Sequence, residues 1–267
     1  MAVKEIVKPI ILQRADPWIY KHTDGYYYFT ASVPEYDRIE IRRSKTINGL
    51  AESEAVTVWR KHKEGMLSAN IWAPEIHYID GKWYVYFAAA RTTETKEGLF
   101  DHRIFVLENE SENPLEGSWV EKGQLKTNWE SFALDATTFE HKGIRYLVWA
   151  QKDPNICGNS NLYIAKMSNP WTIEGKQVMI TEPEYDWEKI GFLVNEGPAV
   201  INRNGKIFIS YSASATDFNY CMGVLIADEN SDLLNKDSWH KSETPVFKTD
   251  EEKEIYGPGH SCFTVSE

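Results

Sequence analysis

The stretch WAPEIHYIDGKWYVYFAAA, residues 72–90, decides the fold class of this chain. It holds two runs of aromatic and apolar residues around Asp80-Gly81, a dipeptide typical of tight β-hairpin turns. Similar paired runs surround Lys142-Gly143 and Asn204-Gly205. No segment keeps the 3.6-residue apolar period of an amphipathic helix over about 12 residues. The sequence therefore predicts a mostly β protein.

A polar anchor residue, often next to Pro or Gly, recurs at the start of these units. The anchors are Asp16 in RADPWIY, Glu75 in WAPEIHY, Asp135 in ALDATTF, Glu196 in NEGPAVI and His260 in GPGHSCF, with separations of 59, 60, 61 and 64 residues. A period of about 60 residues of strand suits the four-stranded blade of a β-propeller better than any helical repeat. Five anchors predict an all-β, five-bladed propeller that spans residues 1–267 as a single domain.

The fifth blade is expected to be incomplete. Only seven residues follow His260, whereas each earlier anchor is followed by about sixty before the next one. The run IILQ, residues 10–13, is expected to supply one closing strand, and the C-terminal part of the blade is expected to be missing from this chain. We expect a monomer or a weak oligomer, because an exposed blade edge favours weak association between chains.

Charge and cysteine content narrow the possible partners and location. The 29 Lys and Arg residues against 40 Asp and Glu give a net charge of −11, which would repel nucleic acid, anionic membranes and polyanionic polysaccharides. The three cysteines lack the CxxC spacing of a zinc or redox site. The first residues lack the apolar core of a signal peptide. We expect a cytoplasmic protein with a neutral partner, although a secreted protein with a trimmed signal would have the same sequence.

The anchors bring carboxylates to one place, because the innermost strands of a propeller converge on its axis. Such a cluster either forms an acidic rim held by backbone amides or a cation, or it carries out chemistry. With side chains roughly 3.5–5 Å from the axis, Asp16 and Glu196 would lie about 6.5–9.5 Å apart, as the carboxyl groups of an inverting glycosidase do. Asp135 would lie close enough to Glu196 to raise its proton affinity. The pattern favours one ionised base and one protonated acid.

The five motifs RADPWIY, WAPEIHY, LDATTF, NEGPAV and GPGH resemble, in order and spacing, those of glycoside hydrolase family 43. The resemblance implies inverting enzymes on a five-bladed propeller that cut arabinose or xylose linkages. It implies that Asp16 is the general base, that Glu196 is the general acid, and that Asp135 raises the pKa of Glu196 and orients it. By the same resemblance, His260 contacts a water or a cation such as calcium, although a histidine that merely starts a strand would give the same motif.

The resemblance also implies which residues bind the substrate and which sugar is released. Glu75 is expected to form hydrogen bonds inside the pocket, and Trp72 is a candidate platform for a sugar ring or an ordinary packed indole. The segments around the first two anchors are similar to the exo-acting α-L-arabinofuranosidases, which implies release of arabinose from the non-reducing end of α-1,5-linked arabinan or arabino-oligosaccharides. No cofactor is required for this chemistry. An arginine that helps to hold the sugar often follows GPGH in the family, and the chain lacks it.

Several alternatives stay open at this point. An endo-arabinanase or a β-xylosidase of the same family would carry the same motifs. Invertase-like five-bladed enzymes also use an early Asp-Pro motif, but Glu196 is followed by Gly197 where they have cysteine, which disfavours that retaining class. A carbohydrate-binding propeller without catalysis is the alternative from a different class of protein.

Overall fold

The computed structural model describes residues 9–266, and in them sixteen strands form four antiparallel sheets of four strands each. The first sheet consists of β1 (Ala15–Lys21), β2 (Tyr27–Ser32), β3 (Arg38–Ser44) and β4 (Val56–Arg60). The second consists of β5 (Ala69–Ile79), β6 (Lys82–Ala90), β7 (Arg103–Asn109) and β8 (Val120–Gln124). The third consists of β9 (Ala133–His141), β10 (Ile144–Gln151), β11 (Asn161–Asn169) and β12 (Thr172–Thr181). The fourth consists of β13 (Asn195–Arg203), β14 (Lys206–Ala213), β15 (Cys221–Asp228) and β16 (His240–Lys241).

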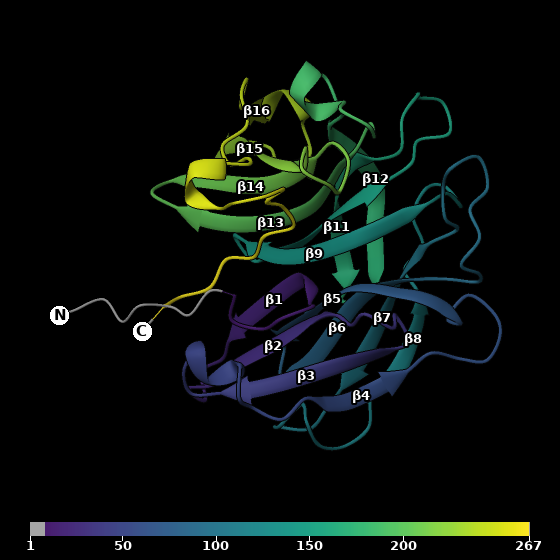
Figure 1. Cartoon of the computed structure of the whole chain (residues 1–267), viewed down its shortest axis with the longest axis vertical. Helices are drawn as coiled ribbons and strands as arrows, with labels where there is room; N and C mark the ends of the chain where they lie inside the picture. The colour runs from purple at the N-terminus through teal and green to yellow at the C-terminus, as the bar shows by residue number, and fades with distance from the viewer. Residues whose placement is uncertain (1–8, 267) are drawn as a thin grey trace.

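The four sheets are blades arranged in a ring, with the first strand of each blade innermost (Figure 1). β5 contacts both β1 and β9, and β9 contacts β13, so the inner strands surround a common centre. Short 3₁₀ helices lie in the connections: η1 (Asn48–Leu50), η2 (Asp186–Glu188), η3 (Lys236–Ser238) and η4 (Glu251–Lys253). Within the described residues, no helix is long and apolar enough to cross a membrane. The predicted all-β propeller is confirmed.

The three predicted hairpins form as the turn dipeptides require. Asp80-Gly81, Lys142-Gly143 and Asn204-Gly205 connect β5 to β6, β9 to β10 and β13 to β14, and all six residues have positive φ. Two consecutive residues with positive φ give the turn whose twist matches that of the strands it connects. These turns fix the register of the two inner strands in three of the blades.

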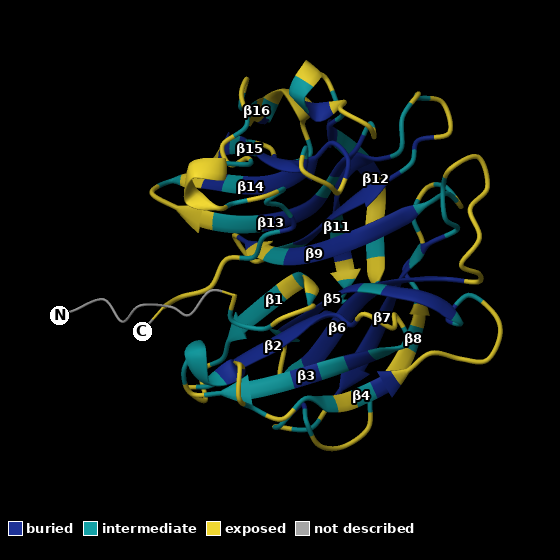
Figure 2. Ribbon diagram, in the orientation of Figure 1, coloured by how far each residue is buried: buried dark blue, intermediate teal, exposed yellow. Residues whose placement is uncertain are grey.

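The faces of neighbouring blades pack together through aromatic and aliphatic side chains. One cluster joins the first two blades around Tyr28 and Trp83, the next joins the second and third around Tyr86 and Trp149, and another includes Tyr211 and joins the third to the fourth. Figure 2 shows β2, β6 and β9 as largely buried, whereas the residues of β1 are intermediate or exposed. Burying such a large side chain contributes roughly 1.5–3 kcal/mol. Most of the aromatic content therefore stabilises the ring.

Each innermost strand contains a bulge at the same place, and this corrects the predicted register of the repeat. The bulges lie between Ala15 and Trp18, Trp72 and Glu75, Leu134 and Thr137, and Glu196 and Ala199. Each holds one residue with positive φ: Asp16 (54°), Ala73 (45°), Asp135 (53°) and Gly197 (54°). The structural equivalents of Asp16 are therefore Ala73 and Gly197, whereas the predicted anchors Glu75 and Glu196 lie beside the bulge position.

The described residues form four blades instead of the five that the motif count predicts. After β16, residues 242–266 form no strand and contribute only η4 and isolated bridges, such as the one between Met222 and Phe247. Residues 10–13 form no strand, so the expected closing strand is wrong. The segment from Gly257 onward instead passes from the fourth blade to the first, where the Tyr27 hydroxyl donates to the Val265 carbonyl over 2.8 Å. Among residues 9–266, no strand pairs with this segment.

Candidate active site

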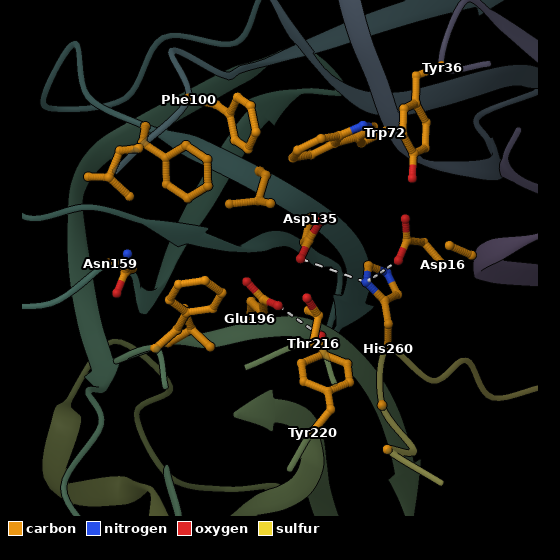
Figure 3. A pocket seen from close by; sticks show the side chains of 18 of the residues that line it. Asp16, Tyr36, Trp72, Phe100, Asp135, Asn159, Glu196, Thr216, Tyr220 and His260 are labelled. Atoms are coloured by element: carbon orange, nitrogen blue, oxygen red, sulfur yellow. Dashed lines mark hydrogen bonds and ion pairs between the residues drawn. The ribbon is translucent and has the colours of Figure 1, made fainter. Parts of the chain in front are cut away.

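A cavity of about 680 Å³ lies where the inner strands meet. Five of the six predicted site residues line it: Asp16, Trp72, Asp135, Glu196 and His260. Figure 3 shows the three carboxyl groups and the imidazole close together, with aromatic side chains such as Trp72, Phe100 and Tyr220 around them. The motifs that lie far apart in the sequence thus come together at one site.

The bulges aim the acidic side chains into this cavity. Asp16 and Asp135 have positive φ, a conformation that costs a non-glycine residue about 1 kcal/mol or more and persists only where the surroundings enforce it. At Gly197 a Cβ atom would lie 3.1 Å from the His260 ring, so a side chain there would require the imidazole to shift by a few tenths of an ångström. The Glu-Gly pair therefore lets Glu196 face the cavity while the imidazole packs against the next residue.

Asp16 is held through both carboxylate oxygens. Oδ2 accepts a hydrogen bond of 2.6 Å from the Ser32 hydroxyl, which itself accepts one of 2.8 Å from the Ala73 backbone N–H. Oδ1 lies 3.2 Å from Nδ1 of His260, and the Asp16 side chain is still 25 % exposed. A carboxylate that is fixed, paired and open to the cavity is suited to accept a proton from a bound water.

Asp135 is more deeply buried than Asp16 and lies near both His260 and Glu196. Its Oδ2 accepts a hydrogen bond of 3.0 Å from the Gly197 N–H and lies 3.7 Å from Nδ1 of His260. Burial raises the pKa of Asp135 to about 6, with the charge of His260 acting in the opposite direction. Asp135 therefore binds the backbone of Gly197, the residue that follows Glu196 in the chain.

The surroundings of Glu196 make this side chain hold its proton more tightly than an ordinary carboxyl group does. Loss of water around its carboxyl and the charge of Asp135 together raise the pKa of Glu196 to about 8. Burial by itself lowers the pKa of His260, but the charges of Asp16, Asp135 and Glu196 outweigh burial and raise it. A Glu196 that keeps its proton near neutral pH can act as an acid, with the partly exposed Asp16 as the base.

Trp72 combines the two arrangements that its sequence context left open. One face of the indole stacks on His102, with ring centroids 4.1 Å apart, and Phe100 meets it edge-on at 5.0 Å. Trp72 nevertheless lines the cavity, together with the aromatic side chains of Tyr36, Phe100, Phe132 and Phe192. The packed indole is therefore part of an aromatic wall.

Glu75 lies outside the cavity lining, which differs from the expected contact with substrate. It comes two residues after the bulge position Ala73, so its side chain belongs to a deeper layer of the ring. Its carboxyl is 3.0 Å from Nε2 of His77, and both side chains are buried. Burial raises the pKa of Glu75 well above its usual value. Burial and this partner keep the carboxyl inside the protein.

The structure adds cavity residues that the repeat does not predict. Tyr220, from the connection between β14 and β15, donates a hydrogen bond of 2.8 Å to Oε1 of Glu196. Asn159 lines the cavity and accepts a hydrogen bond from the Leu193 N–H, and Arg14 lines it while paired with Glu40 at 3.1 Å. Tyr220 and Asn159 lie in loops outside the repeated motif, so no periodic signal marks them. Arg14 stands in RADPWIY itself, two residues before Asp16.

A metal ion near His260 would need several ligating side chains close together. Within residues 9–266, no group of three or more His, Cys, Asp or Glu side chains is placed to hold a metal ion. Nδ1 of His260 faces the two aspartates at ion-pair distances. The cation expected near His260 stays a prediction, and no chemical step is assigned to it.

Comparison with known proteins agrees with this geometry. The chain is 58% identical over 259 residues to an extracellular exo-α-(1→5)-L-arabinofuranosidase of Streptomyces avermitilis, covering 97% of this chain and 53% of that protein. A protein with the same name from Streptomyces chartreusis is 54% identical, with 97% of this chain and 78% of that protein covered. The chain thus spans about half the length of the first relative and about three quarters of the second.

A solved structure and a family model give the same assignment. The crystal structure of an α-L-arabinofuranosidase from Lactobacillus brevis matches with a TM-score of 0.97 and 58% identity, over 98% of this chain and 82% of that one. The model of glycosyl hydrolases family 43 matches residues 6–267. The chain therefore belongs to glycosyl hydrolase family 43.

Proposed function

We propose that this chain is an inverting, exo-acting α-L-arabinofuranosidase that releases L-arabinofuranose from the non-reducing end of α-1,5-linked arabinan or arabino-oligosaccharides. The observation that carries the chemistry is the contrast between a partly exposed Asp16, paired with His260, and a Glu196 that retains its proton, both lining one cavity. The names of the similar Streptomyces and Lactobacillus proteins support the sugar, and those of the Streptomyces proteins also support the linkage and the exo mode.

In the proposed reaction, Asp16 removes a proton from a water that attacks the anomeric carbon. Glu196 gives its proton to the glycosidic oxygen, which takes the electron pair of the breaking bond and leaves as a hydroxyl. One displacement inverts the anomeric configuration. Asp135 raises the proton affinity of Glu196 and, through the Gly197 N–H, helps to hold the adjacent residue in position.

The aromatic wall and the charge of the protein suit an uncharged sugar chain. Trp72 presents an aromatic surface on which a furanose ring can stack. A protein of net charge −11 does not repel a neutral arabinan, whereas it would repel an acidic polysaccharide. The chemistry needs no cofactor, and any cation near His260 would have a structural role.

For the fold, we propose a five-bladed ring, of which residues 9–266 form four blades. The open side of the ring in Figure 1 lies between the fourth and first blades, where the segment from Gly257 onward crosses. Exposed apolar side chains on this segment and beside it, including Phe247 and Phe263, support a further blade packed there.

The test is hydrolysis of linear α-1,5-arabinotriose by the parent and by Glu196→Gln. We expect the parent to release arabinose and arabinobiose, with inverted configuration in the first product by proton NMR. Products of internal cleavage from longer arabinan would indicate an endo-arabinanase, xylose from xylobiose a β-xylosidase, and retained configuration the invertase-like mechanism. Binding of arabinotriose by the parent without any release would contradict catalysis altogether.

A further inference from the structure

Tyr220 makes the single side-chain hydrogen bond that Glu196 has among residues 9–266. The phenol donates to Oε1 over 2.8 Å, while Oε2 has no partner in the described part of the chain. Figure 3 shows the Tyr220 ring directly beside Glu196, on the side of the cavity formed by the fourth blade. The two carboxyl oxygens of Glu196 therefore have different surroundings.

The ring of Tyr220 is fixed by the GPGH segment. A Cβ atom at Gly259 would lie 2.0 Å from Cε1 of Tyr220, so the backbone of this segment packs directly on the ring. The Tyr220 N–H donates to the Asp217 carbonyl over 3.1 Å, and only 8 % of the residue is exposed. The hydroxyl consequently has little freedom to turn away from Glu196.

Tyr220 is the donor in its hydrogen bond with Glu196. The His260 N–H donates to Oγ of Ser212 over 2.7 Å, and the Tyr220 hydroxyl donates to Oε1 of Glu196 over 2.8 Å. Burial raises the pKa of Tyr220 well above its usual value, so the phenol keeps its proton.

We propose that Tyr220 is the positioning residue of the general acid: by occupying Oε1 of Glu196, it confines the transferable proton to Oε2. This inference rests on the proposed glycosidase function. When the proton passes from Oε2 to the glycosidic oxygen, Glu196 becomes a carboxylate and the Tyr220 hydrogen bond becomes charge-assisted. Such bonds are about twice as strong as neutral ones, so the interaction strengthens as the reaction proceeds.

The test uses Tyr220→Phe with two substrates that differ in their need for an acid. We expect kcat/KM for α-1,5-arabinobiose to fall about 10- to 100-fold, since a hydrogen bond to a charged group is lost. Hydrolysis of 2,4-dinitrophenyl α-L-arabinofuranoside should fall less than about threefold, because its leaving group departs without protonation. Equal losses on both substrates would overturn the proposal, because they would indicate general disruption of the site.

A pH profile adds a second readout. Removal of the Tyr220 donor destabilises the carboxylate form of Glu196, so the alkaline limb of kcat/KM should move to higher pH. Site-specific 3-fluorotyrosine at position 220 is a stronger donor and should move the limb to lower pH. Tyr84→Phe is the matched control, because Tyr84 also donates from a buried phenol, to Glu108 over 2.7 Å in the second blade. Its limb should coincide with that of the parent.

A titration separates this proposal from the proposed function. The pKa of Glu196 can be followed by carbon-13 NMR of glutamate-labelled protein, with Glu196→Gln to assign the resonance. If the parent cleaves neither arabinofuranoside, the proposed function fails, yet the pKa of Glu196 should still rise in Tyr220→Phe. An unchanged pKa would refute the role of Tyr220 whether or not the parent is active.

Discussion

Asp16 and Glu196 line one cavity from the first and fourth blades, but the protein treats them in opposite ways. Asp16 receives a hydrogen bond from Ser32, lies beside His260 and is partly open to solvent. Glu196 receives one hydrogen bond from a neutral phenol, and among residues 9–266 no Lys or Arg pairs with it. The comparison teaches that the surroundings of a carboxyl group, and not its residue type, decide which group is the base and which is the acid.

The largest expected effect separates the two groups directly. Asp16→Asn and Glu196→Gln should each lower kcat/KM for arabinobiose by about 10²- to 10⁴-fold, the contribution of general acid–base catalysis. With the dinitrophenyl arabinofuranoside, Glu196→Gln should recover most of its rate and Asp16→Asn should not, because only the acid becomes dispensable. The measurement is steady-state kinetics on both substrates, with circular dichroism to confirm folding. If Asp16→Asn were the variant that recovered, the two roles would be reversed.

An intermediate effect is expected at Asp135. Its charge raises the pKa of Glu196, which acts while protonated and loses activity as pH rises through that pKa. Asp135→Asn removes the charge, so the alkaline limb of kcat/KM should move to lower pH. The rate at the optimum should also fall, by about 10- to 100-fold, since the contact with the Gly197 N–H is altered. A limb that stays in place would contradict the coupling between Asp135 and Glu196.

The smallest effect is expected on the base side, at Ser32→Ala. This change removes the hydrogen bond to Asp16 and leaves the buried Ala73 N–H without a partner, which costs about 1–3 kcal/mol of unfolding free energy. We expect kcat/KM to fall only severalfold, because His260 still lies beside Asp16. Urea unfolding and kinetics measure the two effects. Ser210→Ala is a matched control from the fourth blade, whose hydroxyl bonds to Ser261 without contacting Asp16.

Much of the fold could be predicted because its signals are local. The Asp-Gly and Asn-Gly turns fix hairpins without reference to the rest of the chain, and the recurrence of similar motifs indicates a ring of blades. The register of the repeat was harder to predict. Glu75 is acidic, as a site residue would be, but the position equivalent to Asp16 is Ala73. Pro17, Pro74 and Pro198 carried the better signal, since each follows the residue with positive φ in its strand.

The remaining features depend on contacts between distant segments. Tyr220 reaches Glu196 from a loop, and its position depends on Gly259, about forty residues later in the chain. Nothing in the residues around Tyr220 indicates this contact. A blade forms only where strands have neighbouring strands with which to pair, and a count of motifs does not reveal this. GPGH matches an anchor motif, yet the segment that carries it forms no strand.

The segment from Gly257 onward connects the fourth blade to the first through hydrogen bonds to both. Ser212 binds its backbone in the fourth blade and Tyr27 binds it in the first, while His260 lies between them beside Asp16. The segment that crosses the open side of the ring thus also lines the cavity. A sugar held between Asp16 and Glu196 would bridge the two blades that this segment connects. By thermodynamic linkage, ligand occupancy and integrity of the ring would then reinforce each other.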